Sequence, residues 1–232
     1  MKAAIIAAGQ GERLQRAGVP KPLVKVAGVP LIDHTLNAIR AAGLHQVACI
    51  INQQSAAVAE HCAAITDLSL TFVHRTTPSS MESLFTLAPY LLDDAFLLLT
   101  VDAIVAPFAV RDFVRAAQMR SDAAGVLAVS TFIDDEKPLR VTCGVDGRVT
   151  AIGESAGDSP SITAGFYVFR PTIFAEIAAA RAARFTALRQ FLAHLVARGY
   201  RLFGERVPKS VDVDRPEDVA TAEAFIRSGY TA

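Results

Sequence analysis

Short apolar runs alternate with segments of helical periodicity through the first 130 residues. Buried strands are predicted over residues 3–7, 47–51, 70–73, 96–101 and 125–129, most of which are apolar without alternation. Apolar residues recur at helical spacing over residues 31–42, 55–65, 81–92 and 108–120. Strands without polar alternation are typical of parallel sheets covered on both faces. Repeated strand–helix units therefore predict right-handed crossovers and an open parallel sheet.

The pattern changes after residue 130. Residues 140–152 alternate around Asp146-Gly147, which predicts a β-hairpin. Further strands are predicted over residues 162–169 and 201–207, and further helices over residues 184–198 and 216–227. No repeat or linker divides the chain, so we expect one domain over residues 1–232. The predicted fold class is α/β: a mostly parallel, mixed open sheet flanked by helices, with a β-hairpin insertion.

Composition narrows the function classes. Lys and Arg together number 23, and so do Asp and Glu, so there is no basic excess for nucleic acid or anionic membranes. Hydrophobic residues make up 52%, which excludes a disordered chain. The longest apolar stretch, residues 95–110, is interrupted by Asp102 and Pro107, and the three cysteines form no CxxC pair. We therefore expect a cytoplasmic protein with no nucleic-acid or membrane partner.

A glycine-containing loop follows the first predicted strand directly. Gly9 and Gly11 would let backbone N–H groups approach a phosphate closely. A dinucleotide-binding loop needs a third glycine where Leu14 stands, and a P-loop needs a Gly-Lys-Ser/Thr sequence that is absent. An isolated Gly-x-Gly is also compatible with a plain tight turn.

The loop is part of a longer string that continues through Pro20-Lys21-Pro22-Leu23 and Gly28-Val29-Pro30. This string resembles the signature of the nucleotidyltransferases that join an NTP to a phosphorylated sugar or alcohol and release pyrophosphate, a family of glycosyltransferase-A-like fold. The resemblance implies that the loop wraps the triphosphate and that two catalytic cations neutralise it. The implied catalytic residues are Arg13 and Lys21, and the other implied nucleotide-binding residues are Ala7, Ala8, Gly9, Gly11, Glu12 and Ser83.

Physical reasoning supports this interpretation independently of the family. The transfer of an anionic group from one oxygen to another builds negative charge in the transition state. Two cations beside a flexible backbone loop would stabilise that charge. Lys21 taken alone could be a solvated surface lysine, but Pro20 and Pro22 stiffen the segment that carries it.

Acidic residues stand at two distant places. Asp102 ends the strand predicted over residues 96–101, where ligands bind in open α/β sheets. It could instead begin a turn or cap a helix, and Asp214 could cap the helix opened by Pro216. The resemblance implies that Asp102 and Asp214 hold one Mg²⁺. Asp212 is the competing ligand, because strand alternation puts it on the same side as Asp214; we favour Asp214, with Asp212 as a neighbouring or acceptor contact.

Three residues are candidates for the acceptor side. The resemblance implies that Glu154 and Gly165 line the acceptor pocket, although a surface acid and a bulge glycine would fit the same sequence. Lys209 could meet an acceptor phosphate or lie at a strand edge. The sequence Ser83-Leu84 resembles the branch that handles choline phosphate, inositol phosphate or related alcohol phosphates, rather than the Gly-Thr-Ala motif of many sugar-phosphate members.

The predicted function is the Mg²⁺-dependent transfer of a nucleoside monophosphate from an NTP, with CTP or UTP preferred, to a phosphorylated sugar or alcohol. A homo-oligomer is compatible with this prediction. The alternative is a nucleotide-binding regulatory subunit that has kept the fold without the chemistry.

Two other sequence patterns point to functions that we disfavour. The interrupted helix after Gly11 argues against a dehydrogenase, and Gly153–Gly157 matches the hydrolase elbow pattern but is followed by Asp158-Ser159-Pro160 rather than a helix.

Overall fold

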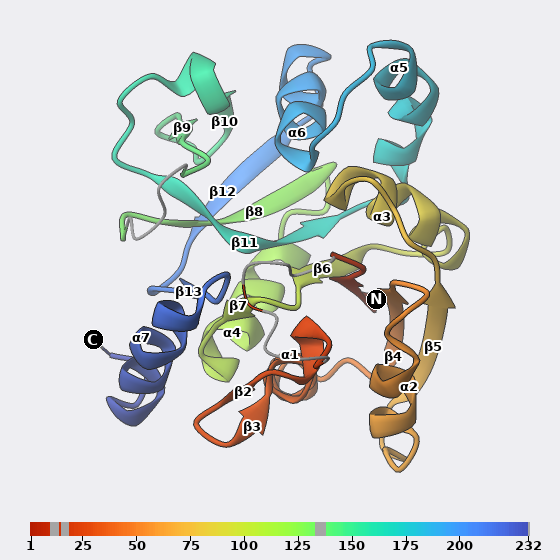
Figure 1. Cartoon of the computed structure of the whole chain (residues 1–232). Coiled ribbons are helices and arrows are strands. Elements are labelled where there is room, and N and C mark those ends of the chain that lie inside the picture. The colour runs from red at the N-terminus through yellow and green to blue at the C-terminus, as the bar shows by residue number, and fades with distance from the viewer. Residues whose placement is uncertain (10–13, 15–18, 133–137, 232) are drawn as a thin grey trace.

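A seven-stranded sheet, in the order β12-β8-β11-β6-β1-β4-β5, runs through the molecule (Figure 1). The computed structural model describes residues 1–9, 14, 19–132 and 138–231, and all statements below concern these residues. The strands are β1 (Lys2–Ala7), β4 (Gln46–Ile51), β5 (Ser69–His74), β6 (Phe96–Thr100), β8 (Gly125–Ser130), β11 (Ile162–Phe169) and β12 (Leu202–Arg206). Strand β11 is antiparallel to both neighbours, and the other neighbouring pairs are parallel. The prediction of a mostly parallel, mixed sheet is confirmed.

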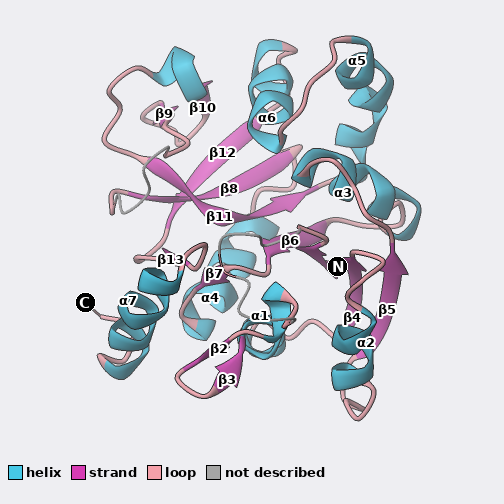
Figure 2. Ribbon diagram, viewed as in Figure 1, coloured by secondary structure: helices cyan, strands magenta, loops and turns pink. Residues whose placement is uncertain are grey.

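Helices cover both faces of the sheet (Figure 2). They are α1 (Leu31–Ala41), α2 (Ala56–Cys62), α3 (Ser80–Leu87), α4 (Pro107–Gln118), α5 (Ile177–Ala182), α6 (Leu188–Ala197) and α7 (Pro216–Arg227). Short 3-10 helices are η1 (Lys21–Leu23), η2 (Ala88–Tyr90), η3 (Gly153–Ala156) and η4 (Pro171–Glu176). Among the described residues, no helix has the length and apolar character needed to cross a membrane.

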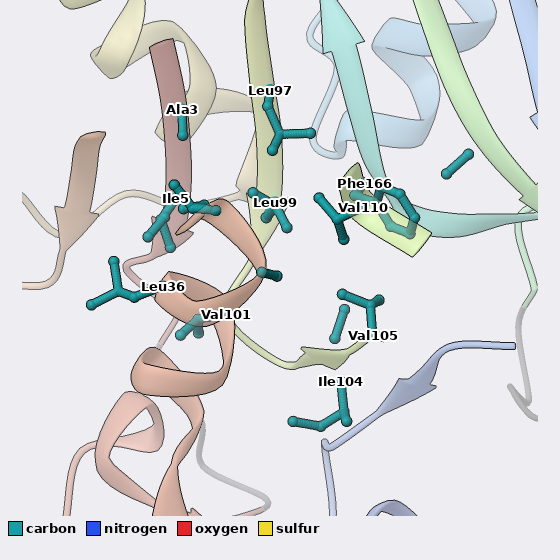
Figure 3. Close-up of a cluster of buried hydrophobic side chains, with 14 of the residues drawn as sticks. Ala3, Ile5, Leu36, Leu97, Leu99, Val101, Ile104, Val105, Val110 and Phe166 are labelled. Atoms are coloured by element: carbon teal, nitrogen blue, oxygen red, sulfur yellow. The ribbon is translucent and has the colours of Figure 1, made fainter. Parts of the chain in front are cut away.

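Alternation along each strand divides the apolar residues between two cores. Ala3 and Ile5 of β1 join the core beneath α1, α4 and α7, which Figure 3 shows, whereas Ala4 and Ile6 join the core beneath α3 and α6. Because side chains alternate across a strand, a sheet buried on both faces needs apolar residues at every position. This explains why the central strands β1, β4 and β6 are nearly unbroken apolar runs in the sequence.

The predicted hairpin is confirmed, with β9 (Val141–Cys143) paired antiparallel to β10 (Val149–Ile152). Gly147, in the turn between them, has a φ of +81°, a conformation that glycine adopts without strain. Two further two-stranded pairings involve shorter strands. The relevant strands are β2 (Lys25–Val26) with β3 (Val29–Pro30), and β7 (Ala103–Ile104) with β13 (Val211–Asp212).

Two predicted helix boundaries are wrong. The helix predicted over residues 81–92 ends at Leu87 and continues as η2, which contains Pro89. The helix predicted over residues 184–198 begins only at Leu188. The side chain of Gln190 accepts hydrogen bonds from the backbone N–H groups of Thr186 and Ala187, and these bonds define the start of α6.

Gly125 gives a test of packing at the start of β8. A Cβ atom at this position would stand 2.5 Å from Cδ1 of the fully buried Phe169 ring. Gly125→Ala is therefore expected to lower the free energy of unfolding by about 1–3 kcal/mol, because an extra methyl group overpacks the core. Urea denaturation measures this loss. Gly144→Ala is the matched control, since Gly144 is exposed on the hairpin. Equal urea midpoints for the two variants would contradict the prediction.

Candidate active site

Lys21 brings the two predicted acidic segments together. Its Nζ atom donates hydrogen bonds to Oδ2 of Asp102 at 2.8 Å and to Oδ1 of Asp214 at 2.5 Å. The Lys21 side chain is only 9% exposed, whereas those of Asp102 and Asp214 are 29% and 55% exposed. The two aspartates, distant in sequence, therefore both contact a single nitrogen atom.

Backbone pairing explains why the C-terminal acids reach the end of β6. Strand β13 pairs antiparallel with β7, so that Asp212 stands opposite Ala103. The backbone N–H of Val213 donates to the carbonyl oxygen of Asp102 at 3.0 Å. The segment that precedes α7 is thus tied to the carboxyl end of a central strand, where ligands bind in open α/β sheets.

Neither aspartate serves as a helix cap. Arg215 occupies the N-cap position of α7, and the Asp218 carboxylate accepts from the backbone N–H groups of Asp214 and Arg215. Helix α4 begins after Ala106 rather than after Asp102. Because Asp218 satisfies the start of α7, the Asp214 side chain can point to Lys21 instead.

Charge pairing holds Lys21 and Asp102 ionised. Burial acts to lower the pKa of the Lys21 ammonium, but the carboxylates of Asp102 and Asp214 outweigh it and raise the pKa above its usual range. Burial also acts to raise the pKa of the Asp102 carboxyl, and the Lys21 ammonium with the Thr100 hydroxyl holds it below its usual range. Lys21 is therefore a cation, and Asp102 an anion, at neutral pH.

A cavity of about 570 Å³ lies beside this cluster. Of the predicted nucleotide-binding residues, those that line it are Ala7, Gly9, Lys21 and Ser83. Ala8 is buried in the core instead, and Gly11, Glu12 and Arg13 lie outside the described residues. The hydroxyl groups of Ser83 and Thr77, which also lines the cavity, form a hydrogen bond of 2.6 Å.

A second cavity of about 440 Å³ adjoins the first. The residues that line both cavities are Ser80, Thr100, Asp102 and Asp214. Both volumes lie in the range of small-molecule sites. The aspartates thus stand at the junction of two spaces, each large enough for part of a two-substrate complex.

Asp212 differs from Asp214 in position. Both are exposed and alternate with the buried Val211 and Val213, as predicted. Asp214 contacts Lys21 and lines both cavities, whereas Asp212 lines the second cavity only. Oδ1 of Asp212 lies 3.8 Å from the position that a Cβ atom would take at Gly165.

The acceptor candidates are placed differently from one another. Gly165 lines the second cavity and has a φ of +81°, so a side chain there would be strained. Glu154 is exposed on η3 and lines neither of the two cavities. Lys209 places its Nζ 3.9 Å from the centroid of the Phe132 ring and is likewise not a lining residue of either cavity. The structure therefore brings only Gly165 of these three to the cavity.

The Asp102–Asp214 pair has the donor chemistry of a magnesium site completed by substrate. Across the described part of the chain, no group of three or more His, Cys, Asp or Glu side chains could hold a metal ion. Mg²⁺, however, is commonly bound through one or two carboxylates together with substrate phosphates and water. Two carboxylates and one ammonium leave a formal excess of one negative charge, which suits a further cation. The residues present fit the ion.

Solved structures of nucleotidyltransferases share this fold. An inositol-1-phosphate CTP transferase from T. maritima superposes with a TM-score of 0.83 at 19% identity, covering 100% of this chain and 98% of that one. A putative glucose-1-phosphate thymidylyltransferase from Bacillus anthracis gives a TM-score of 0.85 at 16% identity, covering 98% of this chain and 95% of that one. These likenesses define the class of fold.

The family model of the MobA-like NTP transferase domain matches residues 3–200, and the chain belongs to this family. A bifunctional IPC transferase and DIPP synthase from Rubrobacter xylanophilus is 32% identical over 171 residues, which are 72% of this chain and 38% of that protein. The UTP–glucose-1-phosphate uridylyltransferase AglF from Haloferax volcanii is 25% identical over 182 residues, 75% of this chain and 74% of that protein. The chain thus spans well under half the length of the Rubrobacter relative.

Proposed function

We propose that the protein transfers a nucleoside monophosphate from an NTP to a phosphorylated small molecule and releases pyrophosphate. The observation that carries the proposal is the meeting of Asp102 and Asp214 on Lys21, at the junction of two cavities. The first cavity, which contains Gly9 and Ser83, takes the nucleotide. The second cavity, which contains Gly165 and Asp212, takes the acceptor.

The reaction needs positioning more than covalent chemistry. A phosphate oxygen of the acceptor attacks the α-phosphorus of the NTP and forms a new P–O bond, while the bond from the α-phosphorus to the bridging oxygen breaks and pyrophosphate leaves. The acceptor phosphate is already an anion, so no general base is required. Lys21 neutralises charge that develops on the transferred group, and the two cavities hold the reactants in line.

Asp102 and Asp214 would hold a Mg²⁺ ion beside the phosphates. When bound, the ion supplies charge neutralisation and orientation for the phosphate oxygens. The contact of Asp214 with Lys21 favours Asp214 over Asp212 as the second ligand, and leaves Asp212 to the acceptor side.

We propose CTP or UTP as the nucleotide, in keeping with the names of two of the proteins compared above. The T. maritima protein of the same fold is named as a CTP transferase of inositol 1-phosphate, and the Haloferax relative as a UTP–glucose-1-phosphate uridylyltransferase. We propose an alcohol phosphate or a sugar 1-phosphate as the acceptor class.

A substrate panel tests this proposal. Each of the four NTPs is combined with phosphorylated sugars and alcohols in the presence of Mg²⁺, and pyrophosphate release and product mass are measured. We expect one NTP–acceptor pair to give the nucleotidyl product, and we expect a metal chelator to abolish turnover because the carboxylate cluster keeps its excess negative charge. NTP binding without pyrophosphate release from any pair would instead support the regulatory subunit.

A further inference from the structure

Arg189 is the second residue of α6 and lines the acceptor-side cavity. Among the described residues that line this cavity, it is the only Lys, Arg or His. The same lining includes four carboxylates, those of Asp102, Asp212, Asp214 and Asp218. Without a cation, an anionic acceptor entering this cavity would meet charges of its own sign.

Local structure fixes the position of Arg189. Gln190 accepts from the backbone of Ala187 at 3.1 Å and so holds the first turn of α6 in place. Leu188 and Leu192 are 7% and 0% exposed, and they anchor the buried side of the helix against the core. Arg189 itself is exposed and belongs to the cavity lining rather than to the core.

Arg189, Tyr167 and Asp212 all line the acceptor-side cavity. Burial raises the pKa of Tyr167 to about 12, although the hydrogen bond with Thr163 acts to lower it. The negative charge of Asp212 also acts to raise this pKa, and the positive charge of Arg189 acts to lower it. Tyr167 lines the cavity and stands two residues beyond Gly165 on β11. Gly165 in turn lies beside Thr100 and Asp212. Arg189 thus lines the same cavity as Asp102 and Asp214, the aspartate pair at the junction with the first cavity.

We infer that Arg189 binds the phosphate of the acceptor and so makes the second cavity specific for phosphomonoesters. The inference rests on the proposed function. A guanidinium presents its N–H donors in a rigid fork that matches two phosphate oxygens, and such charge-assisted pairs are about twice as strong as neutral hydrogen bonds. Lys21 is committed to the aspartate pair and lines the nucleotide cavity, so the two cations serve different phosphates.

Arg189→Ala is the test, with the NTP–acceptor pair found in the panel. The KM for the acceptor is expected to rise about 10- to 100-fold, the scale of one lost charged hydrogen bond. The KM for the NTP is expected to stay within about twofold. Inorganic phosphate should compete with the acceptor in the wild type and lose this inhibition in the variant. Arg189→Lys should recover part of the affinity, because it restores the charge without the fork.

Arg198→Ala is the matched control at the C-cap of α6, because Arg198 pairs with Glu176 and lines neither cavity. It should leave both KM values unchanged. Turnover by Arg189→Ala with an unchanged acceptor KM would overturn the role of Arg189 and leave the proposed function intact.

Failure of the proposed function gives a different result, in which no pair releases pyrophosphate even with the wild type. Calorimetric titration with sn-glycerol 3-phosphate then tests the anion site directly. Binding to the wild type that Arg189→Ala abolishes would uphold the site. Equal binding to both proteins, or no binding to the wild type, would overturn it.

Discussion

Replacement of Asp102 by asparagine is expected to lower kcat by about 10²–10³-fold while the protein remains folded. The carboxylate contacts Lys21 at the junction of the two cavities and, in the proposed reaction, holds Mg²⁺ beside the transferred phosphate. Asparagine keeps nearly the same shape but removes the charge, and the loss of one preorganised charge contact has this magnitude. Initial rates of pyrophosphate release at saturating NTP and acceptor measure the change.

Three other Asp→Asn variants make the test specific. Asp214→Asn should give a loss of similar size, because Asp214 shares the Lys21 ammonium. Asp212→Asn should act on the acceptor KM more than on kcat, since Asp212 lines only the acceptor-side cavity. Asp112→Asn is the control, because Asp112 pairs with its neighbour Arg111 on the exposed side of α4. A kcat of Asp102→Asn equal to that of Asp112→Asn would refute the metal assignment.

The fold could be predicted because its strands and helices depend on local pattern. The run Phe96–Leu99 is apolar and buried at every position, which is typical of a strand covered on both faces. The Asp146-Gly147 sequence predicted the hairpin, since few residues other than glycine tolerate the positive φ found at Gly147. Boundaries were less accurate where side chains decide them, as at α6, whose start depends on Gln190 reaching back to Thr186 and Ala187.

The candidate site was predictable only in part. The pairing of Asp102 with Asp214 followed from the family resemblance and from the rule that ligands bind at the carboxyl ends of strands. Nothing in the sequence indicated that Lys21 would join the two, because the contact depends on β13 pairing with β7. Arg189 gave no signal at all, since an exposed arginine in the first turn of a helix looks like a solvated residue.

Phe166→Ala is expected to lower the free energy of unfolding by about 3–5 kcal/mol. The ring is 1% exposed and packs edge-to-face on Phe113 of α4, with the ring centroids 4.9 Å apart; Figure 3 shows Phe166 beside Val110 of the same helix. Truncation removes the buried ring and leaves a cavity that the sheet cannot close. Urea-induced unfolding measures the loss, and Phe108→Ala, whose side chain is 42% exposed, is the matched control.

Phe166→Ala also tests whether the core face and the cavity face of β11 act independently. Gly165 and Tyr167 line the acceptor-side cavity, while Phe166 between them enters the core beneath α4, because side chains alternate along β11. Under conditions where the variant is still folded, its acceptor KM should therefore remain close to that of the wild type. A loss of acceptor binding without a loss of stability would show that the two faces of β11 are not independent, and would contradict the division between core and site.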